Sequence, residues 1–438
     1  MYRETARELL SFIDRSPSCY HVVSNIKEIL EADGFEELQE GRPWKLKAGR
    51  SYFVSRNGSS LIAFKLPEKS FTGFQIISSH SDSPSFKVKE NPEIVTENKY
   101  VKLNVEKYGG MICSPWFDRP LSVAGRILVK EGEKICTKLV NIDRDLVMIP
   151  NLAVHMNRDV NDGYKYNVQD DMLPILGDES AKGSFYRLAA ENAGVSEESV
   201  LSTDLFLYNR VKGSFWGANE EYISSGRLDD LQCAFASLQG FRKGKSSRSA
   251  AVYCVLDNEE VGSATKQGAA STFLGDTLRR INRGTSRDEE AFLMALSSSF
   301  MISADNAHGV HPNYTKKTDP TNRPYLNGGI VIKYSANQKY TTDAVSAAVF
   351  KMICNRAVVP YQTFVNRSDM MGGSTLGNIS NTQIALNTVD VGLAQLAMHS
   401  PYESAGVKDT WYFEKAAEEF YSSWIDGTGD GTYRICRE

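Results

Sequence analysis

Hydrophobic positions along this chain follow two patterns. Apolar and polar residues mix at helical spacing over residues 4–12 and 22–30. A further stretch places Leu231, Ala234, Phe235 and Leu238 at i, i+3, i+4 and i+7, which predicts an amphipathic helix with one face on a core. Apolar runs that predict buried strands occupy residues 71–77, 249–256 and 300–303, and strand-like pieces lie within residues 384–396.

The pattern changes between about Lys87 and Ser224. Glycine, proline and charged turns separate short strand-like runs at residues 100–105, 121–129, 135–140 and 146–149. Residues 178–202 are interpreted as helix or loop. The expected fold class is therefore α/β: residues 1–86 and 225–438 would form a central mixed sheet flanked by helices, interrupted by a β-rich domain at residues 87–224.

Composition narrows the class of protein. With 438 residues, 41% hydrophobic and 24% charged, the chain is an ordinary globular protein with room for two domains. The net charge of −4 gives no reason to expect nucleic acid or an anionic membrane as partner. The apolar runs are too short to span a bilayer. The first residues lack the basic start and apolar core of a secretory signal.

The cysteines indicate a reducing compartment. There are seven of them, widely scattered and without a C-x-x-C pair, whereas a disulfide framework or zinc knuckle needs closer, paired spacing. Cys233 and Cys254 stand among apolar residues and are interpreted as core side chains. A cytoplasmic location is expected.

Residues able to bind metal follow four predicted strands and begin one predicted helix: His80, Glu259–Glu260, Asp305, His399 and, at the helix start, Asp229. Ligand sites in open α/β sheets lie outside the carboxyl ends of strands, so these side chains could converge. Imidazole and carboxylate groups suit zinc, manganese or cobalt. A pair of such ions also needs a bridging carboxylate, and this set contains enough carboxylates to supply one.

Two local features refine this hypothesis. Asp82 lies two residues after His80 and could accept the other imidazole N–H. Glu259 and Glu260 are adjacent at a strand end, so one could bind metal while the other acts as general base for a metal-activated water. Taken singly, His80 could be a hydrogen-bonded loop residue and residues 257–260 an exposed acidic turn. The joint occurrence at strand ends favours a metal site, because the chain has only six histidines.

Five segments resemble signatures of the aspartyl aminopeptidase family, and they occur in the family's order: HSDSP at 80–84, SGRLDDL at 225–231, DNEEVGS at 257–263, SADNAH at 303–308 and AMHS at 397–400. The chain is thus similar to a bacterial-type member of these dinuclear zinc metallopeptidases. The resemblance implies a zinc-exopeptidase-like fold with a dimerisation domain as the insertion. It also implies a hydrolase that removes the N-terminal residue of peptides, with a preference for Asp or Glu.

The resemblance further implies a role for each residue of the site. Two divalent ions are expected, zinc in the first place, with manganese and cobalt as alternatives. The implied ligands are His80 and Asp305 for one ion, Glu260 and His399 for the other, and Asp229 as the bridge. Glu259 would be the general base, and Asp82 would orient His80.

Other segments resemble parts of the family's substrate pocket. The segment 149–155 resembles one whose histidine, here His155, reaches a neighbouring subunit's site and stabilises the oxyanion. A hydrogen-bonded histidine within a β module is the alternative. The segments 332–340 and 372–377 imply substrate contacts for Lys333, Tyr340, Gly373 and Ser374. Lys333 would pair with an acidic side chain, although a lone lysine is usually a solvated surface residue. A homo-oligomer built from dimers, up to a dodecamer, is implied by likeness alone.

Several residues depart from the family pattern: Asp230 stands for asparagine, Asn258 for histidine, Tyr402 for arginine, and Met370–Met371 replace the usual pocket residues. Because none of them is an implied ligand, catalysis is expected to survive. Whether the preference for an N-terminal Asp or Glu is strict stays undecided. The alternatives are an aminopeptidase with neutral or hydrophobic specificity and a non-catalytic oligomeric binding protein on the same fold.

Overall fold

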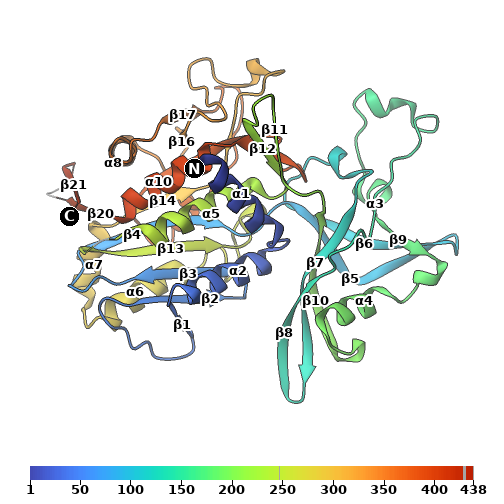
Figure 1. The fold of residues 1–438 in the computed structure, drawn as a ribbon, viewed down its shortest axis with the longest axis horizontal. Coiled ribbons are helices and arrows are strands. Elements are labelled where there is room, and N and C mark those ends of the chain that lie inside the picture. Colours follow the sequence, from blue (N-terminus) through green and yellow to red (C-terminus); the bar gives the residue numbers. More distant parts are fainter. Residues whose placement is uncertain (246, 428–430, 438) are drawn as a thin grey trace.

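The computed structural model describes residues 1–245, 247–427 and 431–437. Two lobes lie side by side in Figure 1: a helix-covered sheet on the left and a smaller β lobe on the right. The larger sheet has 13 strands, and ten of them follow the order β1-β2-β3-β13-β4-β14-β18-β19-β12-β11. The remaining strands, β15, β16 and β17, join the sheet through β18.

The large sheet is mixed. Its centre is parallel, because β13 pairs with β4, β4 with β14 and β14 with β18 in the same direction. Its strands are β1 (Glu36–Leu38), β2 (Ser51–Arg56), β3 (Ser60–Lys65), β4 (Gly73–His80), β11 (Ser214–Trp216), β12 (Tyr222–Ser225), β13 (Ser249–Leu256), β14 (Phe300–Ala304), β15 (Ala307–His308), β16 (Ile330–Tyr334), β17 (Tyr361–Val365), β18 (Asn387–Leu396) and β19 (Glu403–Gly406). The carboxyl ends of the four central strands therefore meet at one edge, and the predicted mixed α/β fold is confirmed.

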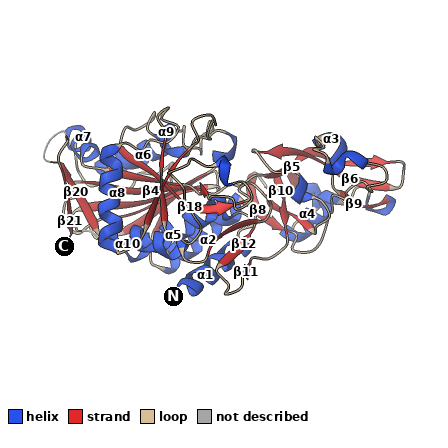
Figure 2. Ribbon diagram, turned by 90° about the horizontal axis from the view of Figure 1, so that it is seen from above, coloured by secondary structure: helices blue, strands red, loops and turns tan. Residues whose placement is uncertain are grey.

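Helices cover both faces of this sheet (Figure 2). One face packs on α1 (Tyr2–Asp14), α2 (Cys19–Ala32), α5 (Leu228–Lys243), α8 (Ala344–Ala357) and α10 (Asp409–Tyr421). The other face packs on α6 (Phe273–Gly284), α7 (Glu289–Ser297) and α9 (Leu376–Ser380). Neighbouring residues of one strand enter opposite cores, as Val252 and Tyr253 of β13 do. Burial on both sides explains why the central strands are continuous apolar runs.

The β lobe has its own six-stranded sheet, in the order β8-β7-β10-β5-β6-β9. Its elements are β5 (Ser85–Thr96), β6 (Tyr100–Tyr108), β7 (Leu121–Glu131), β8 (Lys134–Asn141), β9 (Ile175–Asp178), β10 (Val200–Asn209), α3 (Val168–Asp171) and α4 (Phe185–Ala193). A separate hydrophobic core, which includes Phe86, Trp116 and Leu207, holds it together. β11 and β12 come later in the expected insertion range of 87–224, yet they pair in the large sheet through β19.

One predicted strand of the β lobe is wrong in detail. Residues 146–149 form only isolated bridges, from Val147 to Leu121 and from Met148 to Ile175. The segment runs directly into Pro150, whose nitrogen cannot donate to a sheet. Near the C-terminus, β20 (Ser423–Gly427) and β21 (Tyr433–Arg437) form a separate hairpin.

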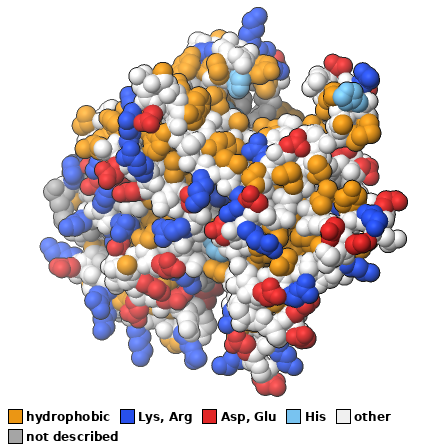
Figure 3. All heavy atoms as spheres, turned by 45° about the vertical axis from the view of Figure 1, so that its right-hand side comes forward, with side chains coloured by type: hydrophobic (Ala, Val, Ile, Leu, Met, Phe, Trp, Pro, Cys, Tyr) orange, Lys and Arg blue, Asp and Glu red, His pale blue; other side chains and the backbone are white. Residues whose placement is uncertain are grey.

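The surface and the cysteines add two observations. Lysine and arginine side chains are interspersed with acidic ones over the face shown in Figure 3. All seven cysteines lie within the described residues and are free thiols.

None of the helices in the described part of the chain has the length and apolar character that crossing a membrane requires.

Candidate metal centre and substrate pocket

The parallel strands bring the sequence-predicted ligands together at one edge of the large sheet. Leu256 of β13 is paired with His80 of β4, so Glu259 and Glu260 begin three residues beyond the same edge. Ser303 of β14 is paired with Ser78, which places Asp305 beside them. His399 follows the end of β18, and Asp229 stands in the first turn of α5, where its backbone is still non-helical.

The converging side chains form two clusters that share Asp229. In the His80 cluster, His80 Nε2 lies 3.6 Å from Asp229 Oδ1 and 3.9 Å from Asp305 Oδ1. In the His399 cluster, His399 Nε2 lies 3.5 Å from Asp229 Oδ2 and 3.4 Å from Glu260 Oε2. The two oxygens of Asp229 thus face different clusters, as a carboxylate that bridges two ions must.

The donor atoms fit divalent cations. Ligand atoms of His80, Asp229, Asp230 and Asp305 lie within 4.8 Å of one another, as do those of Asp229, Glu260 and His399. Asp229 Oδ1 is buried and has no hydrogen-bond partner within the described residues. A carboxylate oxygen buried in that way is costly unless a cation satisfies it. Nitrogen and oxygen ligands of this kind suit zinc.

Burial and mutual repulsion shift the pKa values of the acidic groups. Burial, with neighbouring carboxylates adding to it, raises the pKa of Glu259 to about 8 and raises that of Glu260 strongly. Burial also opposes ionisation of Asp229, but His399 and His80 outweigh it and hold the pKa of Asp229 well below its usual value. Burial lowers the pKa of His80 while Asp230 and Asp229 raise it, and the carboxylates prevail. Burial and mutual repulsion thus oppose ionisation of the two glutamates, and a bound cation would favour their ionised form.

Asp82 lies where the sequence places it, beside His80. Its main-chain oxygen is 3.0 Å and its carboxylate 3.4 Å from His80 Nδ1. The carboxylate also accepts the backbone N–H groups of Glu259 at 3.1 Å and Glu260 at 3.2 Å. Asp82 thus contacts both the histidine and the turn that carries the two glutamates.

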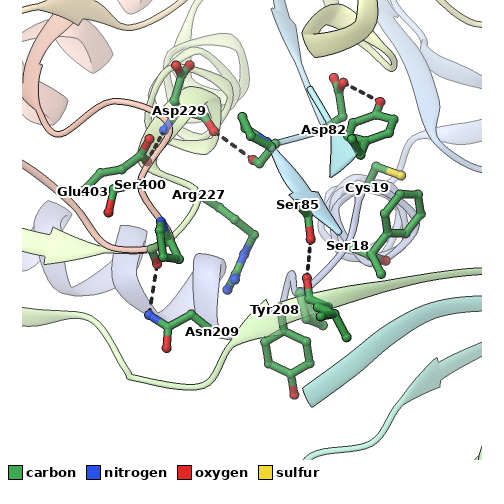
Figure 4. Close-up of a pocket in the computed structure, with 18 of the residues that line it drawn as sticks. Ser18, Cys19, Asp82, Ser85, Tyr208, Asn209, Arg227, Asp229, Ser400 and Glu403 are labelled. Atoms are coloured by element: carbon green, nitrogen blue, oxygen red, sulfur yellow. Dashed lines mark hydrogen bonds between the residues drawn. The ribbon is translucent and has the colours of Figure 1, made fainter. Parts of the chain in front are cut away.

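Sequence reasoning missed two carboxylates that support the centre. Glu403, which is 1% exposed, accepts the backbone N–H of Asp229 at 3.0 Å and that of His399 at 2.8 Å. Figure 4 shows it beside Asp229. Asp230 accepts the backbone N–H of His80 at 3.1 Å. Their signal in the sequence is only that each lies within four residues of an expected ligand.

A cavity of about 270 Å³ opens on the metal centre. The expected substrate contacts Lys333, Tyr340, Gly373 and Ser374 line it, together with Glu259 and the five expected ligands. Six further lining residues had no individual role expected from the sequence: Asn306, Ala307, His308, Phe364, Thr375 and Met398.

Lys333 is held against the metal centre. It is 2% exposed, and its ammonium donates to the main-chain oxygens of Asp305 at 2.8 Å and Asn306 at 3.3 Å. Burial lowers the pKa of Lys333, but the charge of Asp305, 3.5 Å away, outweighs this and leaves it raised. Lys333 is therefore a buried cation, and the usual surface interpretation of a lone lysine does not apply.

Other expected residues lie outside this cavity. His155 is exposed on the β lobe and does not line it. The hydroxyl of Tyr402 contacts Ser214 and the Lys212 carbonyl instead. Met370 and Met371 are exposed.

A carboxylate shared by two histidine–carboxylate clusters, at the carboxyl ends of parallel strands and beside a cavity, is typical of metal-dependent hydrolases. Comparison with known proteins is more specific. The family model described as "Aminopeptidase I zinc metalloprotease (M18)" matches residues 12–421. The "Probable M18 family aminopeptidase 2" of Clostridium acetobutylicum is 50% identical over 427 residues, which cover 96% of this chain and 99% of that protein.

Solved structures agree with this assignment. A chain of the cryo-EM structure of the Ape4 and Nbr1 complex has a TM-score of 0.93 and 35% identity, over 96% of this chain and 86% of that one. The S. cerevisiae mApe1 dodecamer has a TM-score of 0.84 and 28% identity, over 96% and 97%. The chain belongs to the M18 family of zinc aminopeptidases. The expected family, fold class and enzyme class are confirmed, and a non-catalytic binding protein is set aside.

Proposed function

We propose that this aminopeptidase uses two divalent ions, zinc in the first place, and prefers peptides with an acidic N-terminal residue. His80 and Asp305 would hold one ion, Glu260 and His399 the other, and Asp229 would bridge them. The observation that carries this proposal is the placement of the two Asp229 oxygens, one in each cluster. When bound, the ions polarise the scissile carbonyl and lower the pKa of a water molecule.

The remaining steps belong to side chains of this protein. Glu259 lines the cavity and is not one of the five assigned ligands, so its carboxylate would accept a proton from the attacking water. The same carboxyl group then delivers the proton to the nitrogen of the leaving amine. Asp82 holds His80 in orientation through the imidazole Nδ1.

The acidic preference is supported by a buried cation in the wall of the cavity, Lys333. Lys333 is the one lysine or arginine among the described residues that line it. Tyr340 also lines the cavity, and the centroid of its ring lies 5.3 Å from the Lys333 ammonium, so its hydroxyl would be the nearby donor. A substrate carboxylate that reached this corner would meet a cation and a donor.

One observation favours a second candidate, an aminopeptidase with neutral or hydrophobic specificity. The Lys333 ammonium already donates to two carbonyls, and Phe364 and Met398 add apolar surface to the cavity. In that case Lys333 would support Asp305 and leave the substrate side chain to the apolar wall.

A substrate panel separates the two candidates. We expect the wild-type enzyme to cleave aspartyl and glutamyl nitroanilides faster than leucyl nitroanilide. Lys333→Met should lower kcat/KM for the acidic substrates about 10- to 100-fold more than for the leucyl one, because it removes a charge-assisted contact of roughly 1.5–3 kcal/mol. Zinc content measured on the same samples controls for damage to Asp305. Equal losses on all substrates would favour the neutral specificity.

The proposal includes an oligomer in which residues 87–224 form the dimer contact. One structural neighbour is a dodecamer. Apolar side chains lie at the surface of the β lobe (Figure 3), and Leu152, Val154 and Met156 are 51–71% exposed there. Such residues are typical of protein contacts. His155, in the middle of this segment, would then reach the cavity of a second copy and stabilise the oxyanion.

A further inference from the structure

The turn that follows β6 of the β lobe reaches across to the metal centre of the large sheet. Tyr108, at the end of β6, donates its hydroxyl to Asp82 at 2.7 Å, and this bond is drawn from Asp82 in Figure 4. The same hydroxyl accepts an N–H of the Asn258 side chain at 2.8 Å. Tyr108 therefore joins the carboxylate beside His80 to the turn that carries Glu259.

Asn258 is itself held in one orientation. Its side-chain oxygen accepts from the Thr265 hydroxyl at 2.9 Å and from the Gln267 amide at 2.8 Å. With the oxygen engaged, the amide nitrogen is directed at Tyr108. Asn258 is one of the positions that depart from the family pattern, and this contact gives it a role.

The next residue of the turn packs on the other cluster. Gly109 has a φ of +78°, and a Cβ built on it would lie 3.1 Å from the Cβ of Glu260 and 3.3 Å from its main-chain oxygen. Glycine suits both the positive φ and the close approach. The backbone of the β lobe thus contacts Glu260 directly.

The turn also holds His399. The backbone N–H of Ile112 donates to the main-chain oxygen of His399 at 3.1 Å. Gly110 lies beside the imidazole of His399, since a Cβ built on it would lie 3.9 Å from Nδ1, while Nε2 is the ring nitrogen that faces the cluster. Residues 108–112 therefore contact Glu260 and His399 of the His399 cluster, and also Asp82, which contacts His80 of the other cluster.

We propose that residues 108–112 are a positioning element through which the β lobe completes the metal centre. Tyr108 fixes Asp82 and hence His80, while the backbone from Gly109 to Ile112 fixes Glu260 and His399. The inference rests on the proposed ligand assignment. It gives the inserted β lobe a role inside its own subunit, in addition to any contact between subunits.

Two substitutions test the element, each with a matched control in the β lobe. Tyr108→Phe removes the hydroxyl and keeps the ring, which packs edge-on against Phe206. Its control is Tyr208→Phe, which removes a buried hydroxyl bonded to Asn141 at 2.7 Å. Gly109→Ala adds the Cβ that would press on Glu260. Its control is Gly132→Ala, at a φ of +62° with no atom within 4 Å of the added Cβ.

The measurement is zinc affinity, obtained by competition between metal-free protein and a chromogenic chelator, together with kcat, KM and Tm. We expect Tyr108→Phe and Gly109→Ala to weaken zinc binding about 10- to 100-fold and to lower kcat with KM little changed. Each control should leave zinc affinity and kcat as in the wild type, and Tm measured on all four variants separates a loss of stability from a loss of zinc binding.

Two other outcomes would count against the inference, and they are distinguishable. If the wild type binds zinc and hydrolyses peptides, but both test variants match their controls in zinc affinity and kcat, the turn only fills space between the lobes. If the wild type binds no zinc at these residues, the ligand assignment fails first and the inference fails with it.

Discussion

The His80 and His399 clusters differ in how the fold holds them. His80 is the last residue of a central strand and is 1% exposed, and Asp305 directly follows another central strand. His399 lies in a loop beyond β18, has a φ of +66°, and its side chain is 33% exposed. Glu260 likewise stands in a short turn after β13.

The difference shows two ways of building a ligand set. Strand pairing sets the backbone of His80 and Asp305, since both neighbours of β4 are in register with it, and Asp230 adds a bond to the His80 N–H. The His399 cluster has no such frame. It depends on Glu403, which is the first residue of β19 shortly after His399, and on the turn at residues 108–112, which comes from the β lobe. We therefore expect the two clusters to bind and release ions separately, and the His399 cluster to be the weaker.

The largest effect is expected from a residue that is a ligand in neither cluster. Glu259→Gln should lower turnover about 10²- to 10⁴-fold, because both proton transfers lose their carrier. Zinc content, measured by mass spectrometry, should stay at the wild-type level. Glu260→Gln is the control, since it should lose zinc from the His399 cluster. Near-normal turnover by Glu259→Gln would remove this residue from the role of general base.

Substituting the histidine of each cluster tests whether the two clusters bind ions separately. His399→Ala should keep the ion of the His80 cluster, whereas His80→Ala should lose that ion and also destabilise the fold by about 1–3 kcal/mol, because its ring is buried. Zinc content per chain and thermal unfolding report the two effects. In the wild type, a chelator should remove zinc in two phases. A single phase, with equal losses in both variants, would contradict the comparison.

The smallest expected effect is that of pH on the Tm of the metal-free protein. Burial raises the pKa of Glu259 and Glu403 to about 8, so folded, metal-free protein binds more protons than the unfolded chain, whose carboxyl groups titrate near about 4.3. Stability that is present at low pH is then lost as pH rises through about 8. We expect the Tm of metal-free protein to fall by about a few degrees from pH 6 to 8.

Zinc loading should reverse this trend, because ion binding requires the ionised carboxylates and grows stronger with pH. The gap between the Tm values of zinc-loaded and metal-free protein should therefore widen from pH 6 to 8. Glu403→Gln, which removes one titrating group beside the His399 cluster, should flatten the slope of the metal-free form. A Tm of the metal-free wild type that rises over this range would contradict the assignment of these groups.

The helix α10 could not be predicted because charged residues lie on its buried face together with apolar ones. The sequence analysis predicted no helix at residues 409–421, where α10 lies. That helix buries Glu414 and Glu419 along with Phe413 and Phe420, so its pattern has no clean apolar stripe. The buried strands are the opposite case, and the prediction at residues 249–256 matches the bounds of β13.

The sequence by itself determined the α/β class and the residues that converge at the metal centre. It could do so because side chains that follow parallel strands must meet at the same edge of a sheet. Only the tertiary structure decided which groups hold them there. Glu403 contacts Asp229 across 174 positions, and Tyr108 contacts Asn258 across 150. The first contact depends on how β19 and α5 pack within the large lobe, and the second on how the two lobes pack. Spacing along one chain encodes neither packing.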